Sequence, residues 1–317
     1  MTTAGRCRVC GSASVAPRRL EEMMYGSREP YDYYECSACG SLSIAEVPAD
    51  LDRHYPQTYY SFATAEHRPR YGRVARRLAL FVLLNMPVAF SDLLPPKMSR
   101  WRGMRKASVK HATRILDVGC GSGALLRALA RSGFTDLNGV DPFIEQGSTG
   151  PHITITKGEL GDLGGSYDFT LLTHSLEHMS DPLAALRDVA RVCAPGGHVL
   201  ISLPVVNRSW TELGPDWMGL DPPRHLFIPS VSGLAALIGS VPGLRVKDTW
   251  FDTNAMEFCN SGLAKLRVPA SDRATGVATD PAQYFDKAQL ERWSRQARDY
   301  NKRGEAGTAS FLIQKAR

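Results

Sequence analysis

The sequence lacks a segment that could cross a membrane. Its longest apolar run, Leu78 to Phe90, is interrupted by Asn85 and Pro87 and is shorter than the roughly 20 residues that a bilayer requires. Internal repeats and low-complexity tracts are absent, and the first residues do not resemble a secretory signal. Because 43% of the 317 residues are apolar and 22% are charged, we expect a globular protein with a large core, located in the cytoplasm.

Acidic residues are scarce between His67 and Lys110. This stretch has eleven Lys or Arg residues and one acid, Asp92, so the rest of the chain sums to −4 within a total of +6. Such an excess suits an anionic partner, whether a diphosphate-linked substrate, an acidic membrane surface or nucleic acid, and it equally suits a solvated linker. We interpret residues 67–112 as a basic linker with an amphipathic helix at 73–90. This helix either packs on the next domain or lies peripherally on the inner membrane surface.

Cysteine is also scarce, and four of the seven cysteines form two matched pairs. The pairs are Cys7 with Cys10 and Cys36 with Cys39; a glycine follows each, and 25 residues separate them. Each pair can present two thiolates to one ion, and four thiolates complete a tetrahedral Zn²⁺ site with no open position. The sequence therefore predicts a small structural zinc ribbon within residues 1–66. Disulfides and an iron–sulfur cluster are the less favoured alternatives.

From residue 114 onward, short apolar runs alternate with helical patterns. Asp181-Pro182 and Asp280-Pro281 each combine an N-cap residue with a proline at the first helical position. This alternation predicts a parallel sheet with helices on its faces, and a helical insertion at about 253–305 that contributes to a substrate pocket or lid. The predicted strands are 115–118, 137–140, 153–156, 169–173, 199–205, 244–250 and 308–314.

A glycine-rich loop follows the first of these strands. It has the sequence Gly-Cys-Gly-Ser-Gly at 119–123, and glycines there let the backbone approach a ligand that lies across the strand ends. Asp141, at the end of the next strand, can accept hydrogen bonds from both ribose hydroxyls. The spacing differs from the G-x-G-x-x-G of NAD-binding proteins, and Asp117 before the loop suits a cationic amino acid. Together these features favour a nucleoside cofactor that carries such an amino acid.

At these residues the sequence resembles the class I S-adenosylmethionine-dependent methyltransferases. The segments ILDVGCGSG, GVDP, YDFTLLTHSLEHMSDP and APGGHVLISLP carry the resemblance, which is strong over 114–206 and weak over 244–250 and 308–314. It implies a Rossmann-like α/β domain at 113–317 with seven strands in the order 3-2-1-4-5-7-6, the seventh antiparallel. One departure is the short connection from Asp141 to Ile153, which leaves little room for the usual helix.

The resemblance also implies a donor site. Asp162, three residues after Glu159, is an alternative acid for the adenine. The implied contacts are Asp117, Gly119 and Gly121 with the methionine portion, Asp141 with the ribose, Glu159 and Leu160 with the adenine, and His174 beside the sulfonium.

The loop after the fourth predicted strand bears on the acceptor. Residues 173–178 replace the Asn/Asp-Pro-Pro-aromatic loop of methyltransferases that act on nucleobase amines, which favours an oxygen or carbon acceptor. His178 and His225 are the candidate proton acceptors, because imidazole titrates near neutral pH. His178 has a structural alternative, a hydrogen bond that holds its loop to a carbonyl group. Arg224 is either a ligand for a phosphate or carboxylate of the acceptor or an ordinary surface charge.

A zinc ribbon and a Tyr-rich segment ahead of this domain resemble bacterial sugar and polysaccharide methyltransferases. The resemblance implies a small anionic or glycosidic acceptor, such as a nucleotide sugar, a glycan or a secondary metabolite. Tyr59 and Tyr60 would then contact the sugar, or simply pack. Two alternatives stay open: a zinc-ribbon ribosomal RNA methyltransferase, whose RNA would suit the basic stretch, and a cofactor-binding adaptor without catalysis. The oligomeric state is not indicated.

Overall fold

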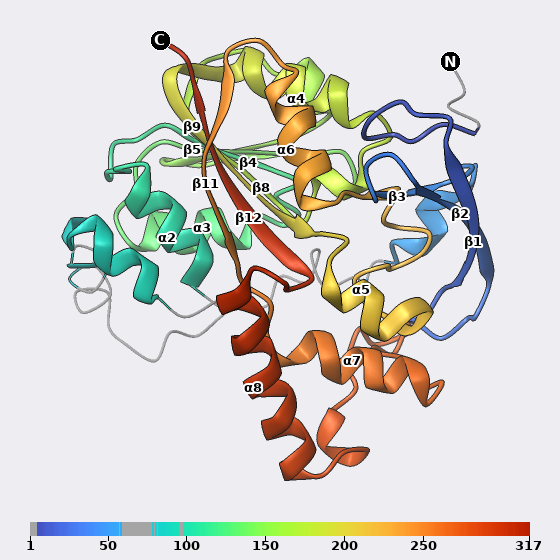
Figure 1. Cartoon of the computed structure of the whole chain (residues 1–317). Helices are drawn as coiled ribbons and strands as arrows, with labels where there is room; N and C mark the ends of the chain where they lie inside the picture. Colours follow the sequence, from blue (N-terminus) through green and yellow to red (C-terminus); the bar gives the residue numbers. More distant parts are fainter. Residues whose placement is uncertain (1–4, 57, 59–77, 79, 81, 95–97) are drawn as a thin grey trace.

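The structure is a computed structural model that describes residues 5–56, 58, 78, 80, 82–94 and 98–317 (Figure 1). Two sheets organise these residues, one of four strands and one of eight. No helix in the described ranges is both long and apolar enough to span a bilayer. Of the helix predicted at 73–90, residues 73–77, 79 and 81 lie outside the described residues; residues 82–85 are helical, and Leu80 and Leu84 are buried against Met104 of α2 (Ser99–Lys106).

The larger sheet corrects the predicted strand count. It has eight strands, because β6 (Ser148–Thr149) pairs antiparallel with β7 (Ile153–Lys157) inside the short connection where a helix does not fit. The seven predicted strands follow the expected order, and β12 runs antiparallel to β9. From one edge to the other, the remaining strands are β11 (Leu244–Phe251), β12 (Thr308–Lys315), β9 (Cys193–Pro204), β8 (Tyr167–Thr173), β4 (Ile115–Val118), β5 (Leu137–Asp141) and β7 (Ile153–Lys157).

Helices cover both faces of this sheet, as its apolar strands require (Figure 1). Consecutive side chains of β4 point to opposite faces: Leu116 packs in the core with α4 (Pro182–Val192) and α6 (Val231–Gly239), whereas Ile115 packs with α2 and α3 (Ala124–Arg131). The N-cap predicted for α4 is confirmed, because the carboxylate of Asp181 accepts the N–H of Ala184 at 2.9 Å.

The segment between β11 and β12 contains α7 (Ala255–Lys265) and α8 (Lys287–Arg303). The prediction that the second of these helices begins at Asp280-Pro281 was wrong. That pair caps only a short 3-10 turn, and the carboxylate of Asp286 caps α8 by accepting the N–H of Gln289 at 2.7 Å. The ring centroids of Phe285 and Trp293 lie 4.7 Å apart. This contact favours the chain turn between the Asp280 cap and the Asp286 cap.

The smaller sheet contains β1 (Val15–Glu21), β2 (Pro30–Cys36) and β3 (Leu42–Ile44), and its fourth strand comes from far along the chain. This strand, β10 (Phe227–Ile228), pairs antiparallel with β3. The apolar core of this sheet is also formed by both segments of the chain, since Tyr33 and Leu42 pack with Trp217. The N-terminal module therefore holds the loop that begins after β9, and with it the segment around His225.

Candidate functional site

The glycine loop after β4 lies closely against the loop that follows β8. Gly119 and Gly121 have φ values of +74° and +51°, in the left-handed region that L side chains rarely adopt. A Cβ atom on Gly119 would lie 2.6 Å from the Cβ of Ser175. The two glycines thus keep the carboxyl end of β4 free of side chains where a ligand would cross it.

Asp141 is fixed by this loop and keeps capacity for a ligand. Its Oδ2 accepts the N–H of Gly121 at 2.8 Å, and its Oδ1 accepts the N–H of Phe143 at 2.9 Å. A carboxylate oxygen has two lone pairs, so each oxygen can accept one further hydrogen bond. Asp141 is therefore held in one orientation and can accept two further hydrogen bonds.

Asp117 is a buried carboxylate with little compensation from the protein. It is 5% exposed, and burial raises the pKa of its carboxyl to about 7; Arg100 opposes this shift and Asp141 adds to it. Arg100, on α2, has a buried Nε without a hydrogen-bond partner. Sequence reasoning missed Arg100, because nothing local in the chain indicates that α2 reaches the strand ends. The two side chains lie close enough for their charges to interact.

The predicted adenine contacts lie just after β7. Leu160 is 6% exposed, whereas the side chain of Glu159 is exposed. The carboxylate of Asp162 accepts the N–H of Glu159 at 3.2 Å and so stabilises its own turn. The side chains of Glu159 and Asp162 form a reciprocal capping box at this turn, so this contact does not distinguish between them as acids for a ligand.

His174 and Glu177 begin the loop after β8. His174 has a φ of +52°, and its Nδ1 lies 3.3 Å from Oε1 of Glu177. Glu177 is fully buried, and neither of its carboxylate oxygens has a well-formed hydrogen bond within the described ranges. Burial raises the pKa of Glu177, but its contacts with His174, His178 and His225 outweigh burial and hold it well below its usual value. Sequence reasoning missed this residue, although it immediately precedes the predicted His178.

A cavity of about 460 Å³ opens beside these residues, at the carboxyl ends of β8 and β9. His174 and His225 line it, together with Asp221. Its far wall comes from α7, within the segment for which the sequence predicted a pocket contribution. Among its lining atoms, three buried oxygens have no hydrogen-bond partner in the described structure: Thr173 Oγ1, Glu257 Oε1 and Asn260 Oδ1.

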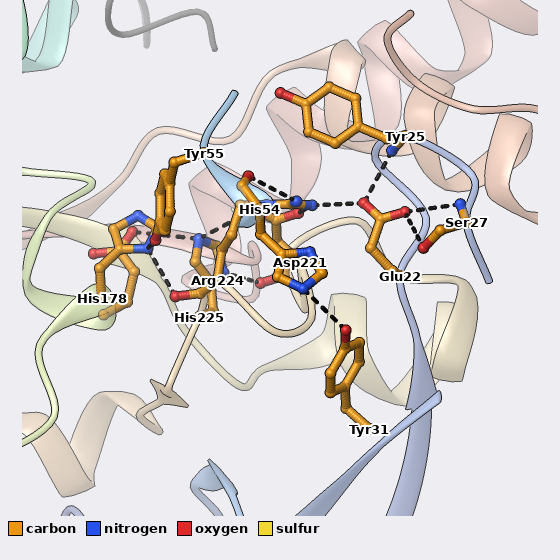
Figure 2. Close-up of polar contacts among 12 residues, drawn as sticks. Glu22, Tyr25, Ser27, Tyr31, His54, Tyr55, His178, Asp221, Arg224 and His225 are labelled. Carbon is orange, nitrogen blue, oxygen red and sulfur yellow. Dashed lines mark hydrogen bonds and ion pairs between the residues drawn. The ribbon is translucent and has the colours of Figure 1, made fainter. Parts of the chain in front are cut away.

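The two candidate proton acceptors lie side by side, with ring centroids 4.9 Å apart (Figure 2). Nδ1 of His178 lies 2.8 Å from the carbonyl oxygen of Arg224, as the structural alternative supposed, and Nδ1 of His225 lies 2.9 Å from that of Gly219. Burial, with a smaller contribution from His225, lowers the pKa of His178 to about 4. Only His225 of the two lines the cavity.

Tyr59 and Tyr60 lie outside the described residues. A neighbouring tyrosine of the same segment, Tyr55, reaches the site: its hydroxyl lies 3.1 Å from Nδ1 of His178, and its ring stacks on Phe143 at 5.0 Å. Because Phe143 follows Asp141 by two residues, Tyr55 links the N-terminal module to the loop that would hold a ribose.

Arg224 is neither on the surface nor in contact with the cavity. Its side chain is fully buried, and Nη2 forms ion pairs with Asp221 and with Glu22 of the N-terminal module, the latter at 2.8 Å (Figure 2). The surface-charge alternative is therefore wrong. A role in binding the acceptor does not fit this environment, since its charge is already neutralised by two carboxylates.

The four N-terminal cysteines converge as the two-pair spacing predicts. Their Sγ atoms all lie within 4.8 Å of one another, and the pairs Cys7–Cys39 and Cys10–Cys36 are each 3.6 Å apart. Sulfur atoms around one tetrahedral Zn²⁺ are about 3.8 Å apart, so the four thiols fit the ion. Burial raises the pKa of Cys36, but backbone N–H groups, chiefly that of Cys39, bring it down to about 7 and favour the thiolate.

We expect Cys36→Ser to lower the zinc content of the purified chain by one equivalent. A structural zinc site contributes its binding free energy to folding, so the β1–β3 module should become sensitive to protease. Metal analysis and limited proteolysis measure both effects. The control is Cys259→Ala, which removes a buried thiol from α7 and should keep the zinc. Equal zinc content in both variants would contradict the assignment.

Taken together, the fold and site define a class: α/β proteins that bind a ligand across the carboxyl ends of parallel strands. Within this class, residues 60–240 match the family of the methyltransferase domain, and the chain belongs to this family.

Individual relatives match a shorter region. Ubiquinone biosynthesis O-methyltransferase of Vibrio parahaemolyticus is 33% identical over 117 residues, which cover 33% of this chain and 49% of the relative. The enzyme of the same name from Pectobacterium atrosepticum is 34% identical over 108 residues, covering 30% and 44%. The chain thus spans about half the length of these relatives. Among solved structures, an S-adenosylmethionine-dependent methyltransferase from Mesorhizobium loti is 20% identical with a TM-score of 0.41, over 68% of this chain and 98% of that one.

Proposed function

We propose that the chain transfers a methyl group from S-adenosylmethionine to an oxygen or carbon of a small glycosidic or anionic acceptor. The observation that carries the proposal is the position of His225 and His174 in one cavity, with the residue after His174, Ser175, packed against the glycine loop. Asp117, Arg100, Gly119 and Gly121 would bind the amino acid portion of the donor and Asp141 its ribose. Glu159 and Leu160 would contact the adenine, and His174 would lie beside the sulfonium.

The donor supplies an activated methyl group, so the protein has to orient the acceptor and remove its proton. His225 is suited to accept that proton. The carbonyl oxygen of Gly219 can only accept a hydrogen bond, so Nδ1 of His225 carries the hydrogen and Nε2 keeps its lone pair. His178, fixed by the carbonyl of Arg224, would assist from the adjacent position.

The cavity lining favours an acceptor with several hydroxyl groups. Most of its lining residues carry polar side chains, and buried polar atoms without partners are rare in folded proteins because each costs free energy. Unpartnered oxygens on Thr173, Glu257 and Asn260 would be satisfied by hydroxyl donors. The basic residues at 67–77 all lie outside the described residues, so the ribosomal RNA alternative stays a prediction.

We expect His225→Gln to reduce methyl transfer about 100-fold to 10,000-fold, the usual contribution of a general base. The assay uses labelled S-adenosylmethionine with nucleotide-linked sugars, lipid-linked glycans and RNA, and mass spectrometry of the products. Binding of the donor should change less than about twofold, which shows that the variant is folded. His198→Gln is the control, because this histidine pairs with Phe169 near the start of β8 and does not line the cavity.

Three results would contradict parts of the proposal. Label on RNA alone would replace the glycosidic acceptor by the ribosomal RNA alternative. Donor binding without transfer to any acceptor would favour the adaptor. Undiminished transfer by His225→Gln would remove this histidine from the reaction.

A further inference from the structure

A group of three potential metal ligands lies next to the cavity and apart from the four cysteines. Glu177, His178 and His225 each place one ligand atom within 4.8 Å of the others. The side chain of His225 is 10% exposed and that of Glu177 is fully buried, so water does not readily satisfy these groups. The three residues come from the loop after β8 and from the loop that β10 holds on the N-terminal module.

Both histidines are oriented as metal-binding histidines usually are. Such histidines commonly donate one ring N–H to a backbone carbonyl, which fixes the tautomer and leaves the other nitrogen free to bind. His178 meets the carbonyl of Arg224 through Nδ1, and His225 meets that of Gly219 through Nδ1. In each ring the nitrogen left with a lone pair is therefore Nε2.

Glu177 provides the second, independent observation. A buried carboxylate is unfavourable unless it is paired and hydrogen-bonded. Oε1 of Glu177 lies 3.3 Å from Nδ1 of His174, but neither carboxylate oxygen has a well-formed hydrogen bond in the part of the chain that the structure describes. Its Oε1 lies 3.9 Å from Nε2 of His225. Donor atoms around one tetrahedral Zn²⁺ are about 3.3 Å apart, so only a small movement would bring these two atoms onto a common ion.

We propose that Glu177, His178 and His225 bind one divalent transition-metal ion, and that its open positions hold two neighbouring oxygens of the acceptor. Two imidazoles and one carboxylate suit Zn²⁺, Co²⁺ or Mn²⁺, and three protein ligands leave positions free. Of the three ligands, His225 lines the cavity, together with His174 and Asp221. An acceptor with adjacent hydroxyls, such as a sugar, would chelate the ion.

The identity of the acceptor rests on the proposed function, whereas the binding of the ion does not. When the ion is bound, the lone pair on Nε2 of His225 is no longer available to a proton. The ion then replaces the imidazole as the group that activates the acceptor: a hydroxyl bound to it loses its proton to water more readily.

The test is a calorimetric titration of the full chain, with its four-cysteine site already loaded with zinc, using Co²⁺. We expect one further ion per chain. Glu177→Gln and His225→Gln should each weaken this binding at least tenfold, whereas His198→Gln should bind like the unaltered chain. Retained donor binding shows that each variant is folded. The absence of a further ion, or equal binding by all variants, would overturn the inference.

Methyl-transfer assays separate this inference from the proposed function. Transfer that depends on His225 in a chain binding no second ion would leave the proposed function standing and the ion site refuted. Binding of a second ion at these residues without transfer to any acceptor would leave the ion site standing and refute the proposed function.

Discussion

Replacing Asp141 by alanine is expected to weaken binding of S-adenosylmethionine about 100-fold or more. Each carboxylate oxygen already accepts one backbone N–H and keeps a lone pair, so two ribose hydroxyls can bind an oriented anion. A hydrogen bond to a charged group contributes about 1.5 to 3 kcal/mol, and two of them correspond to at least a 100-fold change in affinity. Alanine also removes the acceptors for the N–H groups of Gly121 and Phe143, which loosens the loop. Calorimetry with the donor and its demethylated product measures the loss.

The matched control is Asp136→Asn, at the opposite end of β5. Asp136 immediately precedes the strand and accepts a hydrogen bond from Asn138 at 2.8 Å, away from the glycine loop. This variant should bind the donor as the unaltered chain does. Unchanged affinity in Asp141→Ala, with thermal unfolding intact, would contradict the assignment of the ribose site. Tight binding of a dinucleotide in place of the donor would refute the proposed cofactor.

The parallel sheet was predictable because each strand is indicated by its own short stretch of sequence. A strand buried on both faces needs an apolar run, and 115–118 is apolar except for Asp117 and buried along its whole length. The glycine loop and Asp141 follow such strands directly, so their position at the ligand-binding edge follows from topology. The extra strand β6 was not predictable, since its two exposed residues carry no apolar pattern.

The rest of the site depends on contacts between segments that are distant in the sequence. Hydrophobic periodicity and the spacing of motif residues do not indicate such contacts. The hydroxyl of Tyr33 in β2 donates to the carbonyl of His225 at 2.7 Å, and the N–H of Leu226 donates to the carbonyl of Glu177 at 2.8 Å. These bonds connect the zinc module, the loop after β9 and the loop after β8. A sequence pattern could show that His225 is polar among apolar neighbours, but it could not show that β3 holds it through β10.

Arg224→Met is expected to destabilise the folded chain by about 3 to 5 kcal/mol. Methionine nearly fills the space of the arginine stem but leaves Asp221 and Glu22 buried without their cation. Removing one partner of a buried ion pair costs about this much, because the remaining charge is uncompensated. The side chain of Glu22 is 2% exposed, so water cannot solvate its charge in place of Arg224. The midpoint of urea unfolding, with an unchanged slope, measures the effect.

Arg53→Met is the control for this variant, because Arg53 also pairs with two carboxylates but on the surface. Its side chain is 45% exposed beside Glu29 and Asp50, and exposed pairs contribute about 0 to 1 kcal/mol. A loss for Arg224→Met no larger than that for Arg53→Met would contradict the buried-charge argument.

A triple variant separates charge from packing at Arg224. Adding Glu22→Gln and Asp221→Asn to Arg224→Met removes both unpaired charges, so much of the lost stability should return. Glu22 also accepts N–H groups of Tyr25 and Ser27, at 2.9 and 3.1 Å, and an amide oxygen can keep only one of them. Recovery should therefore be incomplete. No recovery at all would mean that Arg224 stabilises the junction between the modules by filling space, with its charge contributing little.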